Sequence, residues 1–254
     1  MRVAVQPIGE VGRRVARVLQ AEPAVDEVVA WGVEEAGRLR VVERLEMADV
    51  AVTDSHKPRP LADACLEGAT SLVTSLSWDD EPVREFAEAG LSLVVGANIE
   101  TGLAAGLALQ EAALMDEPLE VRLAWTVHGK PRRRGEPIPF PEPVGSRWAR
   151  EVDPQGWDSP IPIRTFEAPV DGGWVAAMAQ VSGALDDGIQ RTIVGTADHG
   201  AYLAAIALAA AVVPAGQHAY PSGRSWAFAS PSAYLDRALA AGLDVASYHE
   251  RVAG

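Results

Sequence analysis

Two glycines and an arginine near the start of the chain have the spacing of an anion-binding turn. The segment VAVQPIGEVGRRVARVL, residues 3–19, passes from a strand pattern into a helical pattern through Gly9 and Gly12, and Arg13 follows. The first amides of a helix lack partners within the helix and carry the positive end of its dipole, so such a turn can hold pyrophosphate. Only two glycines of the G-x-G-x-x-G fingerprint are present, and a plain strand–helix turn is the alternative. Arg13 opposes the helix dipole, which favours an anionic ligand over a merely solvated arginine.

The turn and the end of the second strand predict a dinucleotide site for NAD or NADP. The residues expected to contact the dinucleotide at the turn are Ile8, Gly9, Glu10, Val11, Gly12 and Arg13. Glu34 lies just beyond the second strand, where a carboxylate accepts hydrogen bonds from the adenosine ribose and favours NAD. Arg38 is the nearest basic residue, so the sequence leans to NAD and leaves NADP open.

A second group of reactive side chains lies where a later strand meets a basic loop. His128 and Lys130 are alternate residues, so both could face one cleft and supply a proton during reduction. The three arginines at 132–134 have the chemistry to bind a carboxylate or phosphate, which is compatible with an anionic small-molecule substrate. The alternative is a solvated basic loop with both candidate acids on its rim.

Metal and hydrolase chemistry find no support in the sequence. The five histidines are too far apart for a ligand motif, and Cys65 is the one cysteine, so we expect no metal. No G-x-S-x-G elbow occurs either.

The elements that must position the first group alternate strictly between strand and helix. Strands are expected at 2–5, 27–33, 49–55, 70–76 and 91–98, and helices at 10–22, 60–69 and 81–90. This alternation predicts an α/β domain with a doubly wound parallel sheet, the Rossmann type.

The pattern changes after a long helix expected at 101–117. Strands at 119–129, 163–169, 173–185 and 188–196 have no helices between them, which predicts a second, α+β domain with a mixed or antiparallel sheet. A proline-rich stretch, 135–145, interrupts this series as an extended loop. A helix at 198–213 would begin with Asp198 as its N-cap, and a last helix at 230–242 would pack back on the first domain. The expected domains are 1–117, 118–213 and a C-terminal segment, 214–254.

Several loose motifs follow one another in an order that resembles the dihydrodipicolinate reductase family. They are Gly9-Glu10-Val11-Gly12-Arg13, then Asp54-Ser55-His56-Lys57-Pro58, then Thr74-Ser75-Leu76-Ser77, then GANIETG with Asn98 and Gly102, and finally Thr196, Asp198 and Tyr202. The resemblance covers nearly the whole chain. The wider family includes saccharopine and diaminopentanoate dehydrogenase-like relatives. It implies an NAD(P)-dependent oxidoreductase in which Asp54, Ser55, Thr74, Ser75 and Asn98 flank ribose and nicotinamide. It also implies a homodimer or homotetramer built on the second sheet.

The chain departs from that family at the substrate motif. WTVHGKPRRRGEP stands where the family has its histidine run, and Thr126 aligns with the catalytic histidine. Dihydrodipicolinate is therefore excluded as the expected substrate, which leaves a small amino acid, imino acid or carbonyl compound with His128 and Lys130 as candidate catalytic residues. A non-catalytic ligand-binding member of the family is the alternative.

Bulk composition excludes other classes of partner. The net charge of −13 disfavours nucleic acid, which requires clustered Lys and Arg. The longest apolar run, 201–213, is shorter than the roughly 20 residues that a membrane span needs. No signal-peptide pattern opens the sequence, so we expect a cytoplasmic protein.

Overall fold

The chain forms two compact units, each with its own sheet. The structure is a computed structural model, and it describes residues 1–6, 9–131, 133–154, 161–186 and 188–252. Unit 1 comprises Met1–Asn98 and Ala204–Gly242, and unit 2 comprises Ile99–Leu203 and the described part of Leu243–Gly254. Both units are therefore discontinuous in sequence.

The sheet of unit 1 is parallel throughout. Its strands are β1 (Arg2–Val5), β2 (Glu27–Trp31), β3 (Arg40–Val42), β4 (Val50–Thr53), β5 (Ser71–Thr74), β6 (Ser92–Val95) and β13 (Gly223–Trp226). They lie in the order β13-β6-β5-β4-β1-β2-β3, and β1 pairs with β2 on one side and with β4 on the other. The strand order thus reverses beside β1, which confirms the doubly wound Rossmann arrangement and makes the carboxyl ends of β1 and β4 the expected ligand edge.

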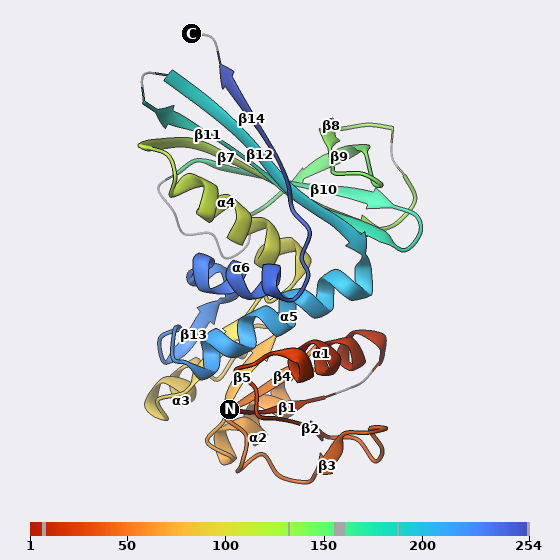
Figure 1. Ribbon diagram of the computed structural model, residues 1–254, viewed down its shortest axis with the longest axis vertical. Helices are drawn as coiled ribbons and strands as arrows, with labels where there is room; N and C mark the ends of the chain where they lie inside the picture. The colour runs from red at the N-terminus through yellow and green to blue at the C-terminus, as the bar shows by residue number, and fades with distance from the viewer. Residues whose placement is uncertain (7–8, 132, 155–160, 187, 253–254) are drawn as a thin grey trace. The chain divides into compact units, whose positions relative to one another are not determined.

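Helices cover both faces of this sheet (Figure 1). They are α1 (Gly9–Ala21), α2 (Arg59–Glu67), α3 (Val83–Glu88), α5 (Gly200–Gly216) and α6 (Pro231–Ala240), with a short 3-10 turn at Ala227–Ala229. Val15 of α1 is buried, so its side chain fits between helix and sheet. The described helices include none that is long and apolar enough to cross a membrane.

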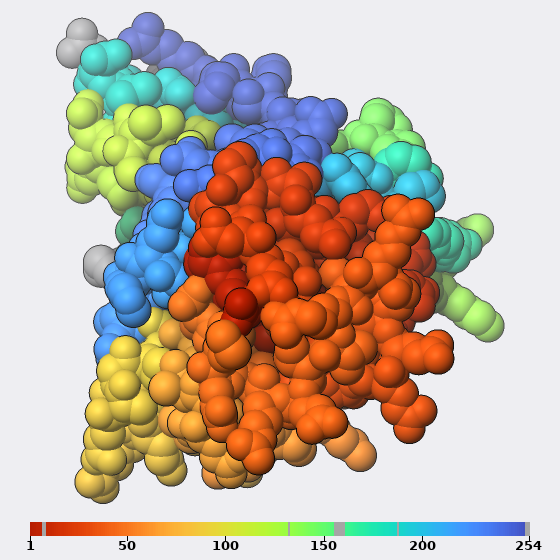
Figure 2. Space-filling model, turned by 60° about the horizontal axis from the view of Figure 1, so that its bottom comes forward, coloured from red at the N-terminus to blue at the C-terminus, as the bar shows by residue number. Residues whose placement is uncertain are grey.

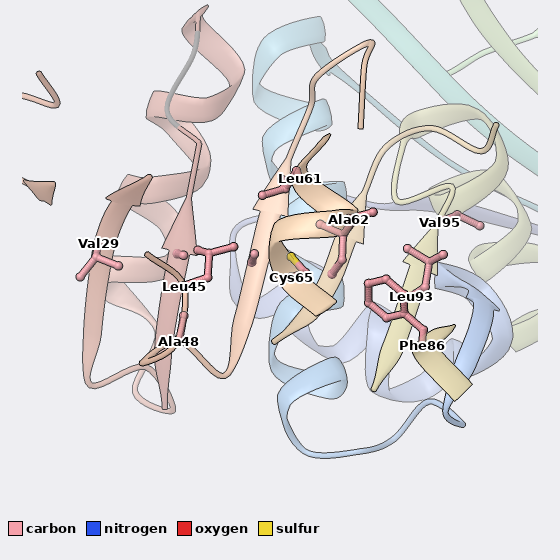
Figure 3. Close-up of a cluster of buried hydrophobic side chains, with 12 residues drawn as sticks. Val29, Leu45, Ala48, Leu61, Ala62, Cys65, Phe86, Leu93 and Val95 are labelled. Atoms are coloured by element: carbon pink, nitrogen blue, oxygen red, sulfur yellow. The ribbon is translucent and has the colours of Figure 1, made fainter. Parts of the chain in front are cut away.

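A cluster of buried side chains fixes one face of the sheet beneath α2 and α3 (Figure 3). Leu72 and Leu93 from adjacent strands meet Cys65 of α2 and Phe86 of α3, all of them fully buried. Val95 extends the same face toward the carboxyl edge. The strands read as continuous apolar runs because both of their faces are buried, which is why the sequence pattern identified them.

The sheet of unit 2 is mixed, as expected. Its strands are β7 (Glu117–His128), β8 (Glu136–Pro139), β9 (Ser146–Val152), β10 (Ile163–Val170), β11 (Trp174–Leu185), β12 (Gly188–His199) and β14 (Ala246–Val252). They lie in the order β14-β12-β11-β7-β10-β9-β8. The β7–β10 pair is parallel, whereas the other pairs of this sheet are antiparallel.

Three expectations about single elements are corrected. The helix expected at 101–117 begins as a π-helical turn, η1 (Ile99–Leu103), and continues as α4 only over Ala104–Ala112. The chain leaves the helix early because it pairs with β11. The Asp116 amide donates to Ala184 O (3.0 Å), and Glu117 is already part of β7. The proline-rich stretch contains strand β8. Asp198 does not cap a helix, because β12 runs through His199 and the Asp198 carboxylate accepts from the His199 amide (2.6 Å).

Candidate functional site

Helix α1 begins with open backbone at Gly9, at the carboxyl edge of unit 1. Gly9 begins α1 with φ +68°, a left-handed conformation that favours glycine. A Cβ added to Gly9 would meet no described atom within 4 Å. Gly12 is buried within the helix, and Ile8 lies outside the described residues. A ligand can therefore approach the backbone at Gly9 without displacing any atom that the structure describes.

The charged residues of this turn separate into a paired and an unpaired arginine. Arg14 binds Glu10 one helical turn away, with Nη2 2.7 Å from Oε1. Arg13 is exposed and forms no ion pair with any described residue. The half-exposed Val11 lies in the same turn, and the exposed Glu34 lies in the loop after β2.

The neighbouring strand ends are tied together by side chains at the reversal of strand order. Thr53 Oγ1 donates to Gln6 Oε1 (2.7 Å) and accepts from the Ser55 amide (3.0 Å). Ser55 Oγ in turn accepts from the Lys57 amide (3.1 Å). Burial raises the pKa of Asp54, against the lowering effect of its own backbone and of His56. Thr53 and Gln6 were not among the residues predicted from the sequence, although both are polar residues at strand ends, and that position is the signal that could have identified them.

A second link joins the ends of β5 and β6. Asn98 Nδ2 donates to Ser75 O (2.8 Å), and the Ala97 amide donates to Thr74 O (3.1 Å). The buried Thr74 hydroxyl accepts from the Leu76 amide (3.3 Å). Thr74, Ser75 and Asn98, three residues expected to flank the nicotinamide, are thus brought together at the carboxyl ends of adjacent strands.

Unit 2 holds a pocket of about 430 Å³ on one face of its sheet. Its lining residues are Glu100, Thr101, Trp125, Arg150, Val152, Asp153 and Glu167. Three of these residues come from neighbouring strands and form the floor of the pocket. Arg150 of β9 pairs with Glu167 of β10, and Glu167 pairs with Trp125 of β7. Directly paired residues share one face of a sheet, so these three side chains stand in a row.

The charges of this pocket are predominantly negative. Arg150 Nη2 lies 2.9 Å from Glu167 Oε1, while Glu100 and Asp153 add two further carboxyls. Glu100 is exposed to solvent. Partial desolvation of its carboxyl by the surrounding protein, together with the charge of Glu167, raises the pKa of Glu100. A carboxyl with a raised pKa in a concave pocket is a candidate proton donor and acceptor.

The two residues expected to be catalytic lie elsewhere in unit 2. His128 is the last residue of β7 and Lys130 follows two residues later, and both are exposed. His128 differs in strand parity from Trp125, so it points from the opposite face of the sheet. Neither residue lines the pocket. Arg133 and Arg134 are also exposed, whereas Arg132 lies outside the described residues.

Together the two units define an architectural class: a Rossmann unit combined with a unit built on a mixed sheet. No protein-family model matches the sequence, and no curated protein is significantly similar to it. Solved dehydrogenase structures do share the fold. An engineered D-amino acid dehydrogenase bound to NADP⁺ matches with a TM-score of 0.53 at 15% identity, over 94% of this chain and 98% of that chain.

Two further solved structures share this architecture. The DAP dehydrogenase of C. glutamicum in complex with DAP has a TM-score of 0.54 at 13% identity and covers 94% of this chain and 98% of its own. Homospermidine synthase from Legionella pneumophila in complex with NAD has a TM-score of 0.58 at 9% identity, over 98% of this chain and 91% of that chain. The likeness establishes the fold that the family resemblance implied.

Proposed function

We propose that the protein is an NAD(P)-dependent oxidoreductase that transfers hydride between a nicotinamide and a small amine-bearing substrate. The observation that carries the proposal is the carboxyl edge of unit 1, where the open left-handed turn at Gly9 lies at the reversal of strand order. In open α/β sheets, ligands bind at such a switch point. Two structures that share the fold were solved with NADP⁺ and with NAD bound, which supports the same cofactor class.

The charge of the unit 2 pocket favours an amine as substrate. Amines are protonated near neutral pH, and the pocket offers three carboxyls, Glu100, Asp153 and Glu167, against one guanidinium. Trp125 adds an aromatic face, which attracts cations. Arg150 supplies the positive charge that the carboxylate of an amino acid would require. The fold relatives named for DAP, D-amino acids and homospermidine also concern amine compounds.

Glu100 is the residue to which we assign the proton. When a nicotinamide cofactor is bound, it accepts or supplies the hydride. As an amine is oxidised to an imine, its carbon loses that hydride and its nitrogen loses a proton, which the Glu100 carboxylate takes. Because the pKa of Glu100 is raised, the group is better matched to proton transfer near neutral pH than an ordinary carboxyl.

Titration with NADH and NADPH tests the proposal. The chain contains 7 tryptophans, so saturable quenching of their emission is expected with at least one of the two nucleotides. If neither nucleotide binds at millimolar concentration, the proposed function is wrong. If a nucleotide does bind, turnover should appear in a screen of amines, amino acids and keto acids with the preferred nucleotide. Binding without any turnover would favour the non-catalytic alternative.

Replacing Gly9 by alanine is expected to weaken dinucleotide binding at least about tenfold, roughly 1.4 kcal/mol. The added methyl occupies the open space that the ligand needs, and the left-handed backbone becomes strained by about 1–2 kcal/mol. Gly90→Ala is the matched control. Gly90 has φ +71° and likewise meets no described atom within 4 Å, but it precedes β6 at the opposite edge of the sheet. The two variants should lose similar unfolding free energy, and equal loss of nucleotide binding in both would contradict the assignment of Gly9.

A further inference from the structure

A second pocket lies wholly within unit 1, between one face of α1 and the loop that follows β2. Its volume is about 420 Å³. Arg13, Arg17 and Gln20 line it from α1, and Glu35 and Arg38 line it from the loop. Arg13 and Arg17 are four residues apart, so their side chains share one face of the helix. Figure 2 shows the segments that carry these residues, coloured red to orange, at the surface of unit 1. Three guanidinium groups therefore surround one surface pocket.

These three arginines differ from all the others in unit 1. The remaining arginines of that unit each form an ion pair with a carboxylate; they are Arg2, Arg14, Arg40, Arg44, Arg59, Arg84, Arg224 and Arg237. Arg13, Arg17 and Arg38 form no ion pair with any residue that the structure describes. The chain carries a net charge of −13, so a lack of carboxylates does not explain the difference.

Leaving the three side chains unpaired is electrostatically unfavourable. Their positive charges repel one another, and Arg13 lies near the positive end of the α1 dipole. Glu35 is the one carboxylate in the lining, so the pocket retains a net positive charge. An anion with two negative charges and several acceptor oxygens would offset this repulsion. A phosphomonoester carries about two negative charges and three terminal acceptor oxygens near neutral pH, whereas a carboxylate carries one charge and two oxygens, so the phosphomonoester is the better match for three guanidinium groups.

We infer that Arg13, Arg17 and Arg38 form a binding site for a phosphomonoester, and that its occupant is the 2′-phosphate of NADP. The identity of the occupant rests on the proposed function. The loop after β2 is where Rossmann proteins meet the adenosine ribose, so a phosphate on the ribose 2′-oxygen would lie at this loop. An NADP site differs from the expectation from the sequence, which favoured NAD because of Glu34. Glu34 is not among the residues that line this pocket. A free phosphate ester presents the same chemistry and is the other source to be tested.

The test compares NADPH, NADH and inorganic phosphate with wild-type protein and with the variants Arg17→Gln and Arg38→Gln. NADPH is expected to bind wild-type protein at least about tenfold more tightly than NADH. Each variant should reduce the affinity for NADPH to that for NADH and leave the affinity for NADH unchanged. Arg44→Gln is the control, because it removes an exposed, paired arginine outside the pocket. Thermal unfolding of all variants establishes that they fold.

The outcomes separate this inference from the proposed function. If both dinucleotides bind with equal affinity and phosphate does not bind, the inference is overturned while the proposed function stands. If neither dinucleotide binds but phosphate binds and requires Arg17, the phosphate site stands, its source is a free phosphate ester, and the proposed function fails. Equal weakening of NADH and NADPH by the arginine variants would also overturn the inference, because the arginines would then not recognise the 2′-phosphate.

Discussion

Replacing Glu100 by glutamine is expected to lower kcat for amine oxidation by about a hundredfold to ten-thousandfold, the usual contribution of a positioned acid–base group. Glutamine keeps the size and polarity of the side chain but cannot take the proton. The raised pKa also fixes the pH dependence. Activity in the oxidative direction should fall in wild-type protein as the pH drops through the Glu100 pKa, which lies above the ordinary 4.5, and this limb should be absent from the variant. Steady-state kinetics across pH with the preferred nucleotide measure both effects.

Folding and charge loss are controlled separately in this experiment. A carboxyl whose pKa is raised in the folded state contributes stability below its unfolded pKa, and that contribution is lost as the pH rises through the folded pKa. Glu100→Gln should therefore unfold at no lower temperature than wild-type protein at neutral pH. Glu111→Gln is the matched control, since burial also raises the pKa of Glu111, in α4 outside the pocket. A Glu100→Gln enzyme that keeps a third or more of wild-type kcat would contradict the assigned role.

The Rossmann unit could be predicted from the sequence because its signals are local. Strand β1 was expected at residues 2–5 and is observed there, and each buried parallel strand is a short apolar run between helices. Strand β14 escaped prediction for the opposite reason. Its sequence, ASYHERV, is mostly polar, and the strand exists because it pairs along β12, more than 50 residues away, with Ile193 opposite Tyr248. Pairing over such a distance is not encoded in a window of neighbouring residues.

The same distinction applies to the two candidate sites, the carboxyl edge of unit 1 and the pocket of unit 2. Ser75 and Asn98 could be named from the sequence because the family resemblance implied them, and each stands in a motif that directly follows a recognisable strand. The unit 2 pocket could not be predicted, because its floor depends on the register that aligns Arg150, Glu167 and Trp125 across three strands. His128 and Lys130 stood out in the sequence through residue type alone. Residue type does not reveal which face of β7 a side chain occupies.

Replacing Phe86 by alanine is expected to lower the unfolding free energy by about 3–5 kcal/mol, the range for large aromatic side chains in a core. Phe86 is fully buried and packs with Leu93 in the cluster beneath α2 and α3 (Figure 3). Helix α3 has only six residues, too few to be stable alone, so its packing holds it in place. Urea unfolding followed by tryptophan emission measures the loss.

The position of Phe86 gives that loss a functional consequence that a surface change on the same helix would lack. Val83→Ala is the matched control, since Val83 is 37% exposed and its loss should cost no more than about 0.5 kcal/mol. A total stability of roughly 5–15 kcal/mol means that Phe86→Ala removes a large share of it. The cavity lies under β5 and β6, whose far ends carry the Ser75–Asn98 link, so nucleotide affinity should fall in Phe86→Ala and remain unchanged in Val83→Ala. A loss below about 1 kcal/mol would mean that the core closes around the missing ring, and that α3 depends on contacts other than Phe86.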